Sequence, residues 1–186
     1  MICGMDEVGR GPLAGPVVAS AVVLSPDFPV EILADSKKLS EKKRLEAYDI
    51  IIQKAVSYGT GWVWPEEIDE INILQASLLA MKRAWLDMTV PVHPDRILVD
   101  GIFLPPIDTD IPMEAIVKGD SKVHEIMAAS ILAKVQRDKW MVDYSKIDGR
   151  YGFEKHKGYP TKAHRDAVAK YGLSPIHRKS FRVSVS

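Results

Sequence analysis

The sequence predicts a mixed α/β fold, in which one central sheet is covered by helices. Apolar, β-branched runs of strand length alternate along the chain with segments that carry apolar residues at helical spacing. At 186 residues and 46% hydrophobic content, the chain is long enough to bury a full core without disulfide or metal cross-links. We therefore expect a single domain over residues 1–186, which includes a short, helical and basic C-terminal segment from about residue 154 to residue 186.

Local patterns define the individual elements. The short apolar opening and the next β-branched run predict two paired strands, joined by a connection rich in glycine and proline. Helices are predicted where a capping residue or a proline precedes apolar residues at helical spacing. The strands expected after the first are residues 17–24, 56–63, 96–100 and 113–117. The expected helices are residues 40–54, 73–87, 121–144 and 161–171, and a first helical turn at residues 65–67 is expected to lead into the second of them.

The composition favours a cytoplasmic protein. Cys3 is the only cysteine in the sequence, so an internal disulfide is excluded and a buried thiol in a reducing compartment is expected. No apolar run approaches the roughly 18 residues of a membrane span, and the N-terminus lacks the basic-then-apolar pattern of a signal peptide. We expect a monomer with no membrane partner, and the sequence leaves protein partners open.

Charge is distributed unevenly along the chain, although the net charge is zero. Residues 66–120 contain 11 acids and 4 Lys or Arg, whereas residues 154–186 contain 8 Lys or Arg and 2 acids. Aromatic residues are interleaved with these bases, a composition that suits sugar-phosphate recognition. We expect this basic C-terminal segment to form part of a duplex-binding surface. The aromatic residues concerned are Tyr151, Phe153, Tyr159, Tyr171 and Phe181.

The residues that end the opening strand carry the strongest chemical signal. Successive side chains on a strand point to opposite faces, so Asp6 and Glu7 can share a ligand only at a bend or at the edge of the sheet. The glycines that follow favour a bend that a sugar-phosphate backbone can approach. Arg10, held between Gly9 and Gly11, is poorly placed for packing but well placed to meet an anion.

Two more acids follow short predicted strands. Asp100 ends the strand 96–100, and Asp120 comes shortly after the strand 113–117. Acids at strand ends are candidates for chemistry, and we expect both strands to deliver their carboxylates near the Asp6 end of the sheet.

Further blocks occur in a fixed order after this opening, and they span nearly the whole chain. In sequence order they are Asp35-Ser36-Lys37-Lys38-Leu39-Ser40, Asn72-Ile73-Leu74, Leu98-Val99-Asp100-Gly101, Lys118-Gly119-Asp120, residues 128–134, Arg137-Asp138 and His156-Lys157-Gly158-Tyr159. In identity and order they resemble the blocks of type 2 ribonucleases H, and specifically of the bacterial ribonuclease HII family. Ordered agreement of this kind is far more specific than an Asp-Glu pair alone.

The resemblance implies a ribonuclease H-like fold and a metal-dependent endonuclease. The implied enzyme hydrolyses RNA in RNA-DNA hybrids and cuts 5′ of single ribonucleotides embedded in duplex DNA, leaving 3′-hydroxyl and 5′-phosphate ends. A cluster of four acids would repel itself without a cation, and oxygen ligands favour Mg²⁺ or Mn²⁺, with two ions expected alongside substrate. The resemblance assigns catalysis and metal binding to Asp6, Glu7, Asp100 and Asp120, and substrate binding to Gly9, Arg10, Gly11, Lys37 and Tyr159.

Two other functions are kept open. A ribonuclease H-like DNA-processing nuclease would share the acidic cluster, although nothing in it calls for Gly9-Arg10-Gly11 with a downstream tyrosine. A nucleic-acid-binding module without catalysis is disfavoured, because uncompensated carboxylates beside phosphates would weaken binding.

Several polar residues are interpreted as structural. Asp138 is expected to pair with its neighbour Arg137 rather than to bind metal, and Asp35 is expected to hold its own loop. The histidines of the basic segment are left out of catalysis, and they are His156, His164 and His177.

Overall fold

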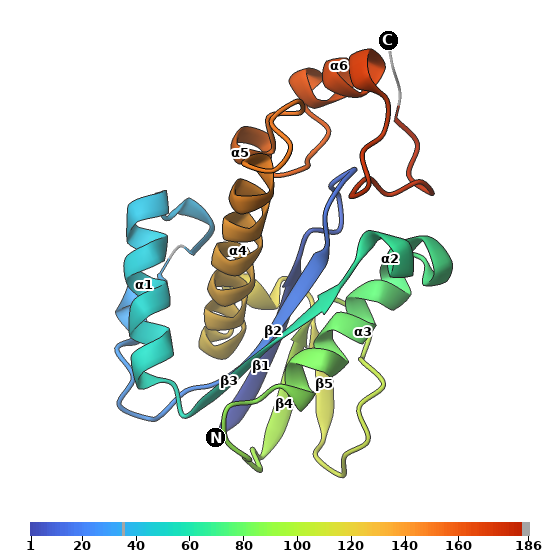
Figure 1. The fold of residues 1–186 in the computed structure, drawn as a ribbon. Helices are drawn as coiled ribbons and strands as arrows, with labels where there is room; N and C mark the ends of the chain where they lie inside the picture. Colours follow the sequence, from blue (N-terminus) through green and yellow to red (C-terminus); the bar gives the residue numbers. More distant parts are fainter. Residues whose placement is uncertain (35, 184–186) are drawn as a thin grey trace.

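The molecule is built on a five-stranded sheet (Figure 1). The computed structural model describes residues 1–34 and 36–183. The strands are β1 (Ile2–Val8), β2 (Val17–Val23), β3 (Ser57–Val63), β4 (Arg96–Asp100) and β5 (Met113–Ile116). Their order is β3-β2-β1-β4-β5, in which β1, β2 and β3 are antiparallel and β4 and β5 run parallel to β1. The sheet is therefore mixed, as the sequence predicts.

Helices cover both faces of this sheet. They are α1 (Glu41–Lys54), α2 (Pro65–Ile71), α3 (Ile73–Leu86), α4 (His124–Ser145), α5 (Phe153–His156) and α6 (Lys162–Tyr171). Figure 1 shows α2 and α3 on one side of the strands, α1 and α4 on the other, and α5 and α6 beyond the end of the sheet. The helices predicted from sequence are all present, and α5, a single turn, was not expected.

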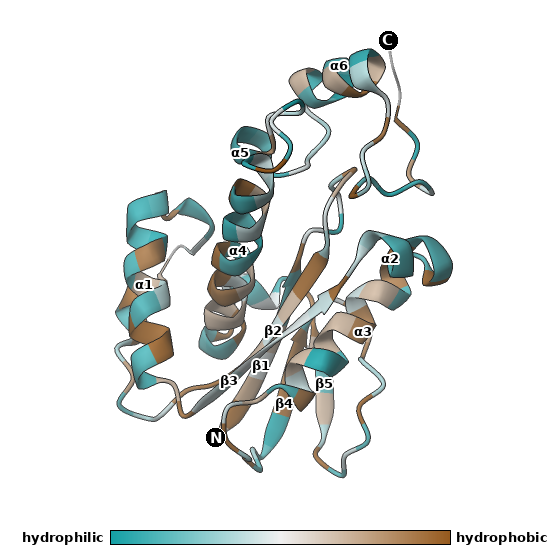
Figure 2. Cartoon of the chain, in the orientation of Figure 1, coloured by the Kyte–Doolittle hydropathy of each residue, from teal (hydrophilic) through white to brown (hydrophobic). Residues whose placement is uncertain are grey.

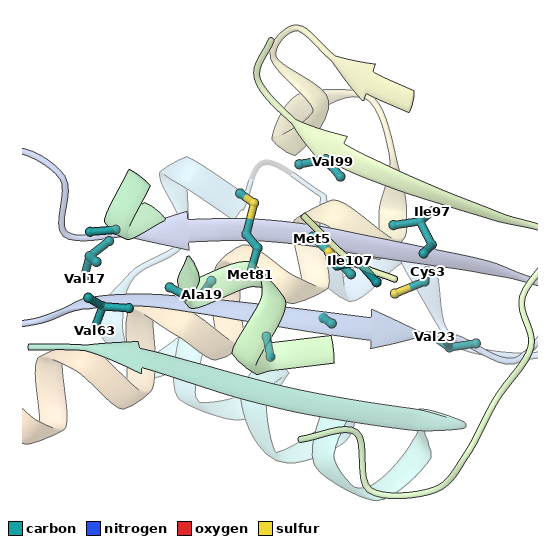
Figure 3. Packing of buried hydrophobic residues seen from close by; sticks show 14 of the residues in the cluster. Cys3, Met5, Val17, Ala19, Val23, Val63, Met81, Ile97, Val99 and Ile107 are labelled. Atoms are coloured by element: carbon teal, nitrogen blue, oxygen red, sulfur yellow. The ribbon is translucent and has the colours of Figure 1, made fainter. Parts of the chain in front are cut away.

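Each face of the sheet has its own buried core. Cys3 and Met5 of β1 pack with Met81 of α3 on one face (Figure 3). Leu132 of α4 and Ile51 of α1 belong to the cluster on the other face. Figure 2 shows polar colouring over much of α1 and α2, whereas β1 and β2 are largely apolar. Within the described part of the chain, no helix combines the length and apolar character needed to cross a membrane.

The two helices that lie closest to the sheet pack over glycines. A Cβ atom on Gly61 would lie 1.9 Å from the carbonyl oxygen of Ala80 in α3. On the opposite face, a Cβ on Gly4 would lie 2.3 Å from the carbonyl carbon of Glu125 in α4. Neither distance is possible for real atoms, so only glycine allows this approach. The position of α4 against β1 is fixed in this way.

The connection between β1 and β2 packs against the C-terminal part of the chain. In Figure 1 this connection projects beyond the sheet toward α5 and the segment after α6. The backbone N–H of Leu13 donates to the carbonyl of Gly158 at 2.8 Å, and that of Gly15 donates to the carbonyl of Ile176 at 2.9 Å. Residues from opposite ends of the sequence therefore form one surface.

Candidate active site

Three carboxylates meet at the sheet edge where β1 and β4 part. The parallel ladder between these strands ends with Met5 opposite Val99. Asp100, the last residue of β4, is therefore level with Asp6, and β1 continues past the end of β4 at Glu7. Carboxylate oxygens of Asp6, Glu7 and Asp100 all lie within 4.8 Å of one another. The two neighbours on β1 thus share a site at a strand edge, one of the two arrangements that their spacing allows.

Asp120 enters the same site from a 3₁₀ turn after β5. Lys118 begins this turn with a left-handed φ of 54°. The backbone N–H of Asp120 donates to Asp100 Oδ1 at 3.2 Å, and its carboxylate pairs with Lys37 Nζ at 2.9 Å. The four acids expected from the sequence therefore line one cavity of about 300 Å³, but in this structure a lysine already neutralises one of them.

Burial and mutual repulsion change the proton affinity of the cluster. Burial raises the pKa of Asp6 well above its usual value, and the charges of Glu7 and Asp100 raise it further. Burial also raises the pKa of Glu7, although Arg10, whose Nη1 lies 3.7 Å from Glu7 Oε1, opposes the shift. Within the described residues, Glu7 Oε2 is buried without a hydrogen-bond partner. This donor set fits a hard divalent cation, which takes oxygen ligands and compensates their charge.

Three basic side chains also line the cavity. Lys37 keeps 68% of its side chain exposed, and the hydrogen bond and charge of Asp120 raise its pKa. Arg44 donates to a loop carbonyl at 3.0 Å, and Lys134 pairs with Asp138 at 3.1 Å. The sequence analysis did not select Arg44 or Lys134, although Lys134 ends one of the recognised blocks.

Two buried arginines, Arg137 and Arg178, hold the β1–β2 loop, residues 9–16. A Cβ on Gly9, whose φ is +94°, would lie 2.5 Å from Arg137 Nε, so both the backbone and the space require glycine. Within the described chain, every hydrogen bond from the two guanidinium groups goes to a backbone carbonyl, at 2.6 to 3.1 Å. The acceptors of Arg178 are Gly9, Arg10, Pro12 and Gly15, and those of Arg137 are Ala14, Pro16 and Lys157.

Tyr159 lies against this loop. A Cβ built on Gly11 would lie 3.6 Å from Tyr159 Cε1, which is ordinary van der Waals contact. The guanidinium carbon of Arg137 lies 5.7 Å from the centroid of the tyrosine ring, within the range of a cation–π interaction. The structure therefore places the predicted tyrosine close to the predicted glycine block, which follows Asp6 and Glu7 in the sequence.

The expected pair of Arg137 and Asp138 is wrong. Asp138 pairs instead with Lys134, one helical turn away, because adjacent helix positions do not face each other. Arg137 turns the other way into the protein, where it is 0% exposed and binds the loop. Asp35, expected to hold its own loop, lies outside the described residues.

Only some residues of the basic C-terminal segment are exposed at the surface. Arg178 is 1% exposed, so its charge cannot belong to a solvent-facing patch. Tyr151 and Phe153 are buried core residues rather than exposed aromatic platforms. Lys155 is exposed and Arg165 is partly exposed, and both remain candidates for contact with a duplex.

The sequence model of ribonuclease HII matches residues 3–184. The chain belongs to the ribonuclease HII family. Ribonuclease HII of Clostridioides difficile (strain 630) is 55% identical over 180 residues, which cover 97% of this chain and 69% of that protein. Ribonuclease HII of Marinomonas sp. (strain MWYL1) is 53% identical over 181 residues, which cover 97% of this chain and 89% of that protein. The crystal structure of ribonuclease H2 from Pyrococcus horikoshii OT3 aligns with a TM-score of 0.78 and 27% identity, covering 98% of this chain and 94% of that one.

Membership in the ribonuclease HII family establishes the general activity. The chain is an endoribonuclease of the ribonuclease H type, a hydrolase, and the family acts on RNA-DNA hybrids and depends on divalent metal ions. The fold is ribonuclease H-like, as the resemblance implies. The acidic cavity described above is the part of the molecule that fits this activity.

Proposed function

We propose that this protein hydrolyses RNA in RNA-DNA hybrids and also cuts 5′ of a single ribonucleotide embedded in duplex DNA. The products would carry 3′-hydroxyl and 5′-phosphate ends. One observation carries the proposal: the acids at the end of β1 lead directly into a loop that contacts Tyr159. Residues 6–11 thus contain both ligands of a candidate metal centre and a candidate contact for the sugar of one nucleotide.

In the proposed reaction, Asp6, Glu7, Asp100 and Asp120 hold two divalent ions, Mg²⁺ or Mn²⁺. Such ions, when bound, lower the pKa of an attacking water and stabilise negative charge on the leaving 3′ oxygen. Asp6 and Asp100 come from adjacent strands and are our choice for shared ligands. Lys37, which now neutralises Asp120, would be free to contact a substrate phosphate once metal charge replaces its own.

Recognition of RNA at a single position requires contact with one 2′-hydroxyl, which can both donate and accept a hydrogen bond. The main chain of Gly9, Arg10 and Gly11 is our candidate for this contact, because Gly11 is exposed and has no side chain that would obstruct a sugar. Tyr159 would pack against the sugar of the following deoxynucleotide and so favour an RNA-to-DNA step. The exposed bases of residues 154–186 would bind the phosphates of the flanking duplex.

The test is incubation with a DNA duplex that holds one ribonucleotide, with and without Mg²⁺. We expect metal-dependent cleavage 5′ of the ribonucleotide and no cleavage of the same duplex made entirely of DNA. Asp100→Asn should lower kcat/KM by roughly three orders of magnitude or more, because it removes a ligand charge. Asp108→Asn, a change at an exposed acid, is the matched control. Near-wild-type turnover by Asp100→Asn, or cutting of the all-DNA duplex, would overturn the proposal.

A further inference from the structure

A chain of hydrogen bonds between buried histidines connects the segment after α6 to Tyr159. The backbone N–H of Ser174 donates to His177 Nδ1 at 2.9 Å. The Nε2 atoms of His177 and His164 lie 2.9 Å apart, and His164 Nδ1 lies 2.9 Å from the carbonyl oxygen of Tyr159. His164 is 0% exposed and His177 is 2% exposed, so bulk solvent does not compete for these bonds.

The partners at the two ends of this chain determine the tautomer of each ring. A neutral imidazole offers one donor and one acceptor. Because the backbone N–H of Ser174 donates to His177 Nδ1, and Ser174 Oγ, 2.7 Å from the same atom, can donate its hydroxyl proton there, we place the proton of His177 on Nε2. His177 Nε2 then donates to His164 Nε2, which leaves the proton of His164 on Nδ1, facing a carbonyl that can only accept. The hydrogen-bond partners at the two ends therefore require the same proton positions. The histidines form a relay of hydrogen bonds in which each ring donates toward Tyr159.

Burial and the same contacts disfavour a second proton on either ring, so both imidazoles stay neutral. Burial lowers the pKa of His177 to about 4, and burial also lowers the pKa of His164. A proton added to His177 Nδ1 would face the N–H of Ser174. His156 stacks on His164 with ring centroids 4.2 Å apart, and its Nδ1 accepts from the N–H of Gly158. The cluster is therefore a neutral packing unit rather than a set of bases for catalysis.

The relay connects the two parts of the proposed sugar-binding site, the β1–β2 loop and Tyr159. The backbone of His177 forms a β-bridge with Ala14 of the β1–β2 loop. The side chain of His177 reaches through His164 to the carbonyl of Tyr159, and the ring of Tyr159 faces Gly11 of the same loop, where a Cβ would lie 3.6 Å from Tyr159 Cε1. A shift of the tyrosine backbone would therefore open or close the space between its ring and the loop.

We propose that His177 and His164 are positioning residues for substrate selection, because their relay sets the location of the Tyr159 main chain relative to the β1–β2 loop. The proposal rests on the proposed role of Tyr159 in reading an RNA-to-DNA step. A misplacement of about 1 Å is enough to lower the rate on a substrate that depends on this contact. A continuous RNA-DNA hybrid, which has no such step, depends less on it.

The first test is the tautomer of each ring in the intact protein, measured from ¹⁵N chemical shifts of the histidine side chains. The sequence has five histidines, and the exposed His93 and His124 serve as internal references for rings outside the relay. We expect the Nε2–H form for His177 and the Nδ1–H form for His164 at neutral pH. The opposite tautomer on His164 would overturn the relay, whatever the activity of the enzyme.

The second test is a matched pair of substitutions at His164. In His164→Asn the amide nitrogen can still donate to the carbonyl of Tyr159 from the position of Nδ1. In His164→Gln the amide lies at the position of Nε2, and that carbonyl loses its donor from this side chain. We expect His164→Gln to lower kcat/KM about tenfold on a single-ribonucleotide duplex and no more than about twofold on a continuous hybrid, with a smaller selective loss for His164→Asn. Equal behaviour of the two variants, or equal losses on both substrates, would overturn the relay.

The third test is a double-mutant cycle with Tyr159→Ala, which separates this proposal from the proposed function. If the relay acts through the tyrosine, His164→Gln should cause no further selective loss in the Tyr159→Ala protein. Additive losses would overturn the relay and leave the role of Tyr159 intact. If Tyr159→Ala lowers kcat/KM equally on both substrates, the proposed role of Tyr159 at the RNA-to-DNA step is overturned instead. Denaturation in urea, together with the ¹⁵N shifts, shows whether each variant keeps the wild-type fold.

Discussion

Asp6→Asn should separate stability from activity, because burial and the neighbouring acids both destabilise the ionised carboxylate of Asp6 in the metal-free protein. Its carboxylate lies within 4.8 Å of the oxygens of Glu7 and Asp100. At an effective dielectric constant of about 20, two full charges at that separation repel by about 3.5 kcal/mol. Uptake of protons by the cluster relieves much of this repulsion, so we expect metal-free Asp6→Asn to be more stable by about 2 kcal/mol. For a protein of this size that corresponds to a rise in Tm of roughly 4 to 8 °C.

The dependence of this gain on pH follows from the direction of the pKa shift. The pKa of Asp6 is higher in the folded protein than in the unfolded chain. Between the two pKa values the folded wild-type protein binds more protons than the unfolded chain, so its free energy of unfolding falls as the pH rises. The advantage of Asp6→Asn should therefore be small near the ordinary pKa of a carboxyl group and should grow toward neutral pH.

Thermal unfolding in EDTA and in Mg²⁺, at about pH 4.5 and pH 7.5, measures these effects. Mg²⁺ should raise the Tm of the wild-type protein more than that of Asp6→Asn, because binding to the folded state alone adds stability. Asp108→Asn should match the wild-type protein throughout, since Asp108 is exposed. A metal-free Asp6→Asn protein that is less stable than wild type at pH 7.5 would refute the reasoning.

Two more predictions concern the C-terminal part of the chain. Arg178→Lys should lower the free energy of unfolding by about 2 to 4 kcal/mol in urea titrations, because an ammonium group cannot reach all four carbonyls that the guanidinium group binds. The same change at the exposed Arg182 should have little effect, and equal losses at both sites would contradict the role assigned to Arg178. Neutralising Lys155, Lys157 and Arg165 together should weaken duplex binding and flatten its dependence on salt, since fewer counterions are released. An unchanged slope in binding titrations over several salt concentrations would make these residues ordinary solvated surface.

Local sequence patterns were sufficient for most of the fold. Ser40 caps α1 as predicted, with its side chain accepting from the N–H of Lys43, and β4 has the predicted bounds. These features depend on residues a few positions apart, which a pattern can detect. The four acids were found for a related reason, because each stands in a short block with its own signature.

The long-range contacts that hold the site in place could not be predicted from local patterns. The hydrogen bonds from Arg178 to the loop span between 163 and 169 residues, and nothing local distinguishes Arg178 from the solvated bases around it. The contact between Lys37 and Asp120 likewise depends on how two distant loops meet. The histidine relay requires the tertiary structure, since only the fold brings His164 to His177. Contacts of this kind follow from topology rather than from periodicity.

The dependence of the β1–β2 loop on Arg178 also sets the order in which the protein can be completed during synthesis. A ribosome releases β1 with its acids first, but the guanidinium group that fixes the following loop emerges 169 residues after Gly9. Closing so long a stretch of chain is entropically costly and can occur only after the sheet and α4 have formed around it. A nascent or clipped chain that ends before Arg178 would therefore hold its carboxylates in place without an ordered β1–β2 loop. We expect such a chain to become a competent nuclease only once Arg178 is in position.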